Sequence, residues 1–265
     1  MTDVHVTHRQ ESPAAEIPEC WRLEPAVTKS NTGVRDGWKF YWEELRDNQQ
    51  IFREQSDDYV RNLESTIELD PNAVVLDFGC GFGFVAEMLS PLVGELFLWD
   101  ASANMRRRAR VKVAGCRNIR FLDLSDSQAS PRDLRFDLIL VNSVVQYMTL
   151  DEFSAWLLRW RQMLAPAGRI VVSDLIPPDY PAVWDFVDLL RFSARRGFLA
   201  RAIWEALGEI FSYLSVRQAR PLTRIGREEL RQRGKAAGLA VHYLPCNLAF
   251  FTKRITAVFT QADHC

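Results

Sequence analysis

The sequence predicts an α/β fold in which helices cover both faces of a doubly wound, mostly parallel sheet. Between Val74 and Ser173, five short apolar runs alternate with helical patterns, and such a β-α-β series gives a parallel sheet. The chain has 265 residues, of which 48% are hydrophobic, enough for one compact core with an elaboration. Its 33 basic and 34 acidic side chains nearly balance, so no global positive field favours nucleic acid as a partner.

The segment before the first strand divides into two parts. Residues 1–30 are polar and contain prolines without a sustained period, which predicts a flexible leader. They also lack an apolar run behind a basic start, so we expect no secretory signal and a cytoplasmic location. Residues 31–68 carry aromatic and charged residues in the pattern of two amphipathic helices. We expect this segment to cover the site, with Tyr41 and Trp42 touching the substrate; packing against the sheet flank is the alternative.

The core is predicted to span residues 69–265. Its first strands are expected at Val74–Phe78, Leu96–Trp99, Ile119–Leu122, Phe136–Val141 and Ile170–Ser173. Helices are expected over Val85–Val93, after Ser102 and after Thr149. Thr149 and Glu152 have capping-box spacing, and Pro166 and Gly168 should stop that last helix.

The regular alternation breaks over residues 175–222, where we predict a helical insertion that closes the acceptor pocket. Helical patterns cover Asp185–Phe192 and Leu199–Leu214. The insertion is rich in aromatic residues, which suit an apolar small-molecule pocket, and Trp184 and Phe192 are the predicted substrate contacts. A homodimer interface is the alternative use of these apolar faces. A helix over Arg227–Ala237 and strands at Ala240–Leu244 and Ile255–Thr260 follow.

The most informative stretch is Asp77–Gly83, which reads DFGCGFG directly after the first strand. Alternate glycines allow a tight turn and let a ligand approach the N–H groups at a helix start. Asp100 follows the second strand, where a carboxylate can accept hydrogen bonds from ribose hydroxyls. The pattern therefore predicts a nucleoside site.

The pattern alone leaves open which nucleoside is bound and whether the protein is an enzyme. Gly81, Gly83 and Ala86 match the dinucleotide fingerprint G-x-G-x-x-G/A, so an NAD-dependent oxidoreductase is one alternative. However, Asp77 precedes the glycines, and its carboxylate would repel a pyrophosphate but attract an ammonium group. No Tyr-x-x-x-Lys spacing follows the fourth strand, which also disfavours hydride transfer. A non-catalytic nucleoside-binding protein is the second alternative.

The Asp77–Gly83 run resembles motif I, D-x-G-x-G-x-G, of the class I S-adenosylmethionine-dependent methyltransferases, and the likeness extends from Val74 to Thr260. The resemblance implies a seven-stranded sheet with an antiparallel last strand, S-adenosyl-L-methionine as cofactor, and a small-molecule acceptor. It also implies that Asp77 and the glycines hold the methionine portion, Asp100 the ribose and Asp123 the adenine. The implied cofactor residues are Asp77, Phe78, Gly79, Cys80, Gly81, Gly83, Asp100, Ala101, Met105, Asp123, Leu124, Asn142 and Ser143.

Other residues admit more than one interpretation. Asp123 or the nearby Asp126 could simply cap a turn. Many relatives carry histidines where this chain has Gln146 and Tyr147, so Tyr147 is the candidate catalytic residue, with core packing as the alternative. The four histidines form no adjacent pair and the five cysteines show no CxxC spacing, so we expect no metal. No apolar stretch reaches membrane-spanning length.

Overall fold

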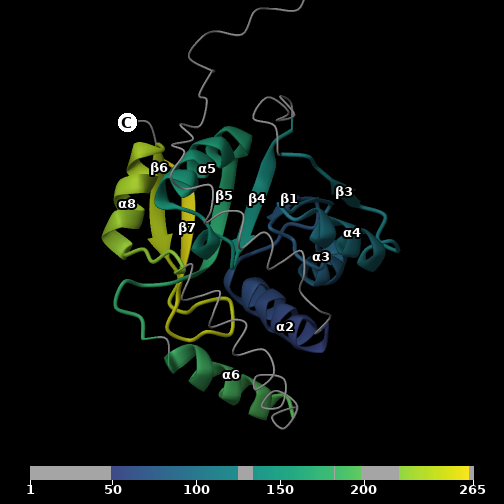
Figure 1. Cartoon of the computed structure of the whole chain (residues 1–265). Helices are drawn as coiled ribbons and strands as arrows, with labels where there is room; N and C mark the ends of the chain where they lie inside the picture. The colour runs from purple at the N-terminus through teal and green to yellow at the C-terminus, as the bar shows by residue number, and fades with distance from the viewer. Residues whose placement is uncertain (1–48, 125–133, 182, 198–220, 263–265) are drawn as a thin grey trace, which may run out of the picture.

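The computed structural model contains one seven-stranded sheet with helices on both faces (Figure 1). It describes residues 49–124, 134–181, 183–197 and 221–262. The strand order is β3-β2-β1-β4-β5-β7-β6. β7 runs antiparallel to both of its neighbours, and the other pairs are parallel. The predicted mostly parallel sheet with an antiparallel last strand is confirmed.

β1 lies inside the sheet between β2 and β4, and the order of the strands along the chain reverses its direction there. Ligands bind at such a switch point, outside the carboxyl ends of the strands. The strands are β1 (Val74–Phe78), β2 (Glu95–Trp99), β3 (Ile119–Phe121), β4 (Phe136–Asn142), β5 (Leu164–Leu175), β6 (Leu239–Tyr243) and β7 (Ile255–Gln261).

Helices cover the two faces in separate groups. The helices are α2 (Gln49–Thr66), α3 (Phe84–Leu89), α4 (Ala103–Lys112), α5 (Leu150–Met163), α6 (Val183–Arg195) and α8 (Arg227–Ala236), with 3-10 turns η2 (Ser90–Leu92) and η3 (Val145–Tyr147). Buried residues of α2, α3 and α4 share one core cluster with Val75 of β1. Those of α5 and α8 share the other cluster with Leu76 and Phe78. Since side chains alternate along a strand, Asp77 faces the α2 side.

Most predicted elements agree with the structure within a residue or two. β1 coincides with its prediction, and the capping box of Thr149 and Glu152 forms at the start of α5. The helix predicted over Val85–Val93 is wrong in its second half, because η2 replaces it with Pro91 at its first turn. The strand predicted at Ile170–Ser173 is longer than expected: β5 already begins at Leu164.

The two segments predicted to cover the site are described only in part. Tyr41, Trp42 and the helix predicted at Leu199–Leu214 lie outside the described residues. The helix α6 belongs to the predicted insertion. It lies below the carboxyl ends of the strands in Figure 1, beside the helix α2. The boundaries of leader, cover and insertion therefore stay predictions. None of the described helices is both long and apolar enough to cross a membrane.

Candidate functional site: the carboxyl edge of the sheet

A loop of left-handed glycines connects β1 to α3. Gly79, Gly81 and Gly83 have φ values of 85°, 51° and 82°, a region that side chains with a Cβ enter only at a cost. The amide of Gly79 donates to the carbonyl of Trp99 over 2.7 Å, which holds the loop against the end of β2. The predicted tight turn between β1 and α3 is present.

The space around these glycines differs from one to the next. A Cβ on Gly79 would overlap the side chain of Val144, and one on Gly83 would lie 3.1 Å from the Cα of Ala109. A Cβ on Gly81 would meet nothing within 4 Å. Gly79 and Gly83 are therefore required for packing within the protein, whereas Gly81 borders open space that a ligand can enter.

Asp100 is fixed directly after β2 by two backbone amides. Its Oδ2 accepts a hydrogen bond of 2.9 Å from Gly81, and its Oδ1 accepts one of 2.8 Å from Ser102. Each carboxylate oxygen has further acceptor capacity. The carboxylate is thus held beside the open side of the glycine loop, where two ribose hydroxyls can donate to it.

Asp77 is a buried carboxylate near the end of β1. Its side chain is 4% exposed, and among the described residues its Oδ2 has no hydrogen-bond partner. Burial raises the pKa of Asp77 to about 7, and the negative charge of Asp100 adds to this rise. Such a group is stabilised by any cation or hydrogen-bond donor that reaches it.

Tyr59 of α2 lies on the same side of the sheet as Asp77 and is fully enclosed. Burial raises the pKa of its phenol most; a contact with Ser173 opposes this rise, and the charge of Asp77 adds to it. The sequence contained no signal for Tyr59 beyond its place on an amphipathic helix. Tyr59 and Asp77 therefore share the α2 side of the sheet, where the charge of Asp77 acts on the phenol.

Hydrogen bonds between side chains join the ends of β4 and β5, and two of the residues involved have unusual backbone conformations. Ser143 and Asp174 have φ values of 57° and 68°, which for residues other than glycine often marks a functional region. The Ser143 hydroxyl donates to Asp174 Oδ2 over 2.8 Å. Beside them, the Ser173 hydroxyl donates to Asn142 Oδ1 over 3.0 Å. The predicted cofactor residues Asn142 and Ser143 therefore have fixed positions.

The surroundings of Asp174 argue against a role in proton transfer. It is 2% exposed, and its two oxygens accept hydrogen bonds from Ser143, Asn247 and Arg254. Burial raises the pKa of Asp174, and the charge of Arg254 opposes the rise. A carboxylate so enclosed serves to hold its neighbours.

The predicted catalytic and substrate residues fall into two groups. Tyr147 and Trp184 both pack against the buried cluster of Ile176, Tyr180 and Leu222, so the structure brings them to one region. Phe192 is 1% exposed and packs on Phe250, with ring centroids 5.0 Å apart. Its side chain belongs to the interior, and the sequence pattern could not distinguish this from an exposed pocket wall.

Four further predicted cofactor residues follow the ends of β2 and β3, and Asp123 among them is the one predicted to contact the adenine. Leu124 is buried and Asp123 is exposed, and the Leu124 carbonyl accepts a hydrogen bond from Arg159 over 2.9 Å. Met105 of α4 packs with Phe82 and Phe84, and Ala101 lies between Asp100 and the helix. Asp126 lies outside the described residues.

Phe78 and Cys80 have side chains with no free face toward a ligand. Phe78 packs among Trp99, Trp156 and Trp160, with ring centroids 4.5 to 4.9 Å apart. Cys80 is buried, and burial raises the pKa of its thiol. Since the thiolate is the nucleophilic form, Cys80 is unsuited to covalent catalysis. Within the described residues, no three His, Cys, Asp or Glu side chains gather in a metal-binding arrangement.

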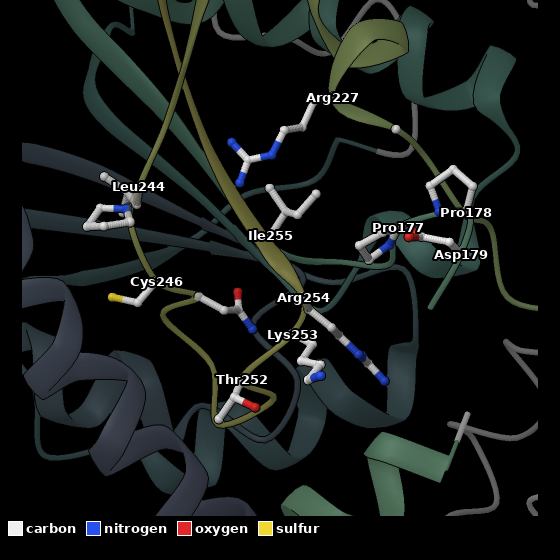
Figure 2. A pocket seen from close by; sticks show the side chains of 13 residues that line it. Pro177, Pro178, Asp179, Arg227, Leu244, Cys246, Thr252, Lys253, Arg254 and Ile255 are labelled. Carbon is white, nitrogen blue, oxygen red and sulfur yellow. The ribbon is translucent and has the colours of Figure 1, made fainter. Parts of the chain in front are cut away.

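A pocket of about 500 Å³ lies farther along the sheet edge, toward β7 and β6 (Figure 2). None of its lining residues belongs to the glycine loop. Its wall includes Arg254 and Asn247, which also bind Asp174, so the pocket and the strand ends share a boundary. It is lined by Pro177–Asp179, Gly226, Arg227, Leu244–Asn247 and Thr252–Ile255.

The strand order, the antiparallel β7 and the glycine loop after β1 match the fold of class I methyltransferases. Residues 75–168 match a family model described as a methyltransferase domain. An uncharacterized methyltransferase of Geobacillus kaustophilus is 28% identical over 134 residues, which cover 51% of this chain and 60% of that relative. The matched region therefore spans less than two thirds of the relative's own length.

Solved structures of methyltransferases share the fold at low sequence identity. Magnesium protoporphyrin IX methyltransferase from Synechocystis PCC 6803 with bound SAH has a TM-score of 0.52 and 16% identity, covering 88% of this chain and 96% of that one. The mitomycin 7-O-methyltransferase MmcR has a TM-score of 0.59 and 17% identity, covering 85% and 60%. DesVI of Streptomyces venezuelae has a TM-score of 0.54 and 15% identity, covering 82% and 100%.

Proposed function

We propose that this protein transfers a methyl group from S-adenosyl-L-methionine to an N, O or C atom of a hydrophobic or aromatic small molecule. The observation that carries the proposal is the buried Oδ2 of Asp77, which has no hydrogen-bond partner among the described residues, just before a glycine loop that is open at Gly81. The ammonium group of the cofactor's methionine portion is a fitting partner for that carboxylate, directly or through water. A pyrophosphate is not, because both groups are anionic.

The cofactor, when bound, supplies a sulfonium whose positive charge activates the methyl group for in-line displacement. The protein's own residues then position the two reactants. Asp100, held by Gly81 and Ser102, orients the ribose, and Asp123 is the proposed adenine contact. The acceptor atom must lie about 3 Å from the methyl group, opposite sulfur, and much of the rate comes from this placement.

Tyr147 is the proposed catalytic residue on the acceptor side. It lies in η3, directly after β4, and shares a cluster with Trp184 of α6. A phenol there can accept or return a proton when the acceptor is a hydroxyl or an ammonium group. Trp184 and the aromatic residues of the N-terminal segment, including Tyr41 and Trp42, are the proposed walls of the acceptor site.

A small molecule is the proposed acceptor class for two reasons. MmcR and the Synechocystis enzyme are named for small-molecule acceptors, and the predicted insertion is rich in aromatic residues. The nearly neutral net charge disfavours nucleic acid. A cytoplasmic location and a homodimer are further proposals from the sequence.

Two measurements test the function. Calorimetry should detect binding of S-adenosylhomocysteine and none of NADH; the opposite result would favour the oxidoreductase. A screen of aromatic acceptors with S-adenosylmethionine, followed by mass spectrometry, should then find a product heavier by one methylene unit. Cofactor binding without any transfer across N-, O- and C-acceptors would favour the non-catalytic nucleoside-binding protein.

A further inference from the structure

Arg254 is a buried cation directly before β7, in a position for which the sequence suggests no role. Its side chain is only 2% exposed. Figure 2 shows it at the boundary of the pocket, beside Lys253 and Thr252. A cation so enclosed is costly unless its partners are well placed.

The guanidinium group of Arg254 binds three side chains from three different elements. Nη1 donates to Asp174 Oδ2 over 2.8 Å and to Gln146 Oε1 over 2.9 Å. Nη2 donates to Asp185 Oδ1 over 2.7 Å. The face of the group also lies 3.7 Å from the ring centroid of Phe251.

These partners connect the predicted acceptor site to the sheet. Asp174 lies near the end of β5 and holds the hydroxyl of Ser143. Gln146 belongs to η3 and is the residue before Tyr147. Asp185 belongs to α6, one residue after Trp184. A single side chain therefore fixes the segment after β4 and the start of α6 relative to each other.

We propose that Arg254 is a positioning residue for methyl transfer, which holds the 142–147 segment against α6 through Asp174, Gln146 and Asp185. The catalytic part of this inference rests on the proposed function. The planar guanidinium suits this task because its donors point in fixed directions toward partners on two sides. A lysine ammonium at this position is a single point charge and cannot keep all three contacts.

The first test measures the segment itself by hydrogen–deuterium exchange of the full chain, without any acceptor. The amides of Tyr147 and Met148 donate to Val144 and Val145 over 3.0 Å, so they report whether η3 is held. In Arg254→Met they should exchange about tenfold faster or more, while amides of β1 keep their rates. Because that variant leaves the buried carboxylate of Asp174 without its cation, the double variant Arg254→Met/Asp174→Asn serves if the first does not fold.

Arg196→Met is the matched control. Arg196 follows α6 and binds Glu54, Asp57 and Asp58 of α2, so it also joins α6 to the protein but does not touch the strand ends. This variant should speed exchange in α6 and leave Tyr147 and Met148 unchanged. Unchanged exchange at Tyr147 and Met148 in a folded Arg254 variant, or the same effect in both variants, would overturn the proposal.

The second test uses an acceptor found by the screen above. Arg254→Met should lower kcat by about 10- to 100-fold, more than it lowers affinity for S-adenosylhomocysteine, and Arg254→Lys should recover part of kcat. An unchanged kcat in a variant with a loosened 142–147 segment would contradict a positioning role. Failure of the proposed function is seen separately, as absent cofactor binding or transfer in the unaltered protein.

Discussion

Gly81 donates its backbone N–H to Oδ2 of Asp100 over 2.9 Å. The hydrogen bond joins the two parts of the proposed cofactor site, because the glycine loop follows β1 and Asp100 follows β2. The same carboxylate also accepts from the amide of Ser102, the N-cap residue of α4. Asp100 therefore organises the protein side of the proposed cofactor site, in addition to its proposed contact with the ribose.

Replacement of Asp100 by alanine should weaken binding of S-adenosylhomocysteine by about 10- to 100-fold, since a charge-assisted hydrogen bond contributes roughly 1.5 to 3 kcal/mol. Calorimetry measures the change. Asp100→Asn keeps one carbonyl oxygen as an acceptor, so its loss should be smaller. Equal affinity of Asp100→Ala and the unaltered protein would remove Asp100 from the ribose site.

Two glycine replacements should separate binding from stability. In Gly81→Ala the new methyl group meets open space. The free energy of unfolding should therefore fall only by the left-handed backbone penalty, about 1 to 2 kcal/mol. Cofactor affinity should fall, because that open space is the proposed ligand path; binding calorimetry and thermal unfolding measure the two effects.

Gly79→Ala is the matched variant at the other end of the loop. Its Cβ would overlap Val144 in addition to the left-handed penalty at φ 85°, so this protein should lose clearly more thermal stability than Gly81→Ala. A Gly81→Ala protein that binds S-adenosylhomocysteine with unaltered affinity would place the cofactor elsewhere.

The pKa of Asp77 predicts how stability without cofactor depends on pH. The native pKa of about 7 exceeds the unfolded value of about 3.9, so between these values the native state binds a proton that the unfolded state has lost. The contribution of Asp77 is therefore full below about pH 4 and is lost as the pH rises to about 7, by at most about 1.4 kcal/mol per unit.

Asp77→Asn removes this dependence. Because a neutral amide resembles the protonated carboxyl, the variant should have a higher Tm than the unaltered protein at pH 8, and the difference should shrink toward pH 5. Differential scanning calorimetry at both pH values measures it. The same variant should bind S-adenosylmethionine more weakly, since the ammonium loses its charged partner; a Tm difference that grows on acidification would refute the assignment.

Alanine replacements at Trp184 and Phe192 should have different effects. Trp184 packs against the cluster near Tyr147, so Trp184→Ala should raise the acceptor KM with nearly unchanged cofactor affinity. Phe192 is buried against Phe250, so Phe192→Ala should lose about 3 to 5 kcal/mol of stability. Dissociation of either variant from dimer to monomer on a sizing column would instead indicate an interface.

Tyr147→Phe tests the hydroxyl of the proposed catalytic residue. If proton transfer limits the reaction, kcat should fall by about 100-fold or more, with the KM for S-adenosylmethionine nearly unchanged. Tyr243→Phe is the control, because Tyr243 lies on the edge strand β6 and its hydroxyl donates to the Arg227 carbonyl over 2.6 Å. Equal kcat values for both variants would leave Tyr147 with a packing role.

Local patterns predicted the elements whose causes are local. The bounds of β1 were predicted correctly because its apolar residues belong to the two core clusters. The start of α5 was predicted from its capping box. The early part of β5 was missed because Pro166 and Gly168 usually end elements. In the structure Leu164 pairs with Phe136 across an irregularity, and a Cβ at Gly168 would lie 2.5 Å from the Phe136 carbonyl.

The same distinction applies to the site. The glycine loop and Asp100 are readable because their spacing along the chain is itself the pattern. The pairing of Arg254 with Gln146 joins residues 108 positions apart, and Tyr59 lies on the Asp77 side of the sheet because its helix packs there. Such contacts depend on how distant elements pack, and no short window of sequence records them.

The position of β7 has a consequence for synthesis of the chain. Among the described strands β7 comes last in sequence, yet it lies between β5 and β6 and is the strand that joins β6 to the sheet. While the ribosome is still making residues before 255, one edge of β5 is open and β6 has no strand to join. Nascent or truncated chains thus expose backbone that can pair with other chains, and folding of this half of the sheet must wait until translation passes Gln261.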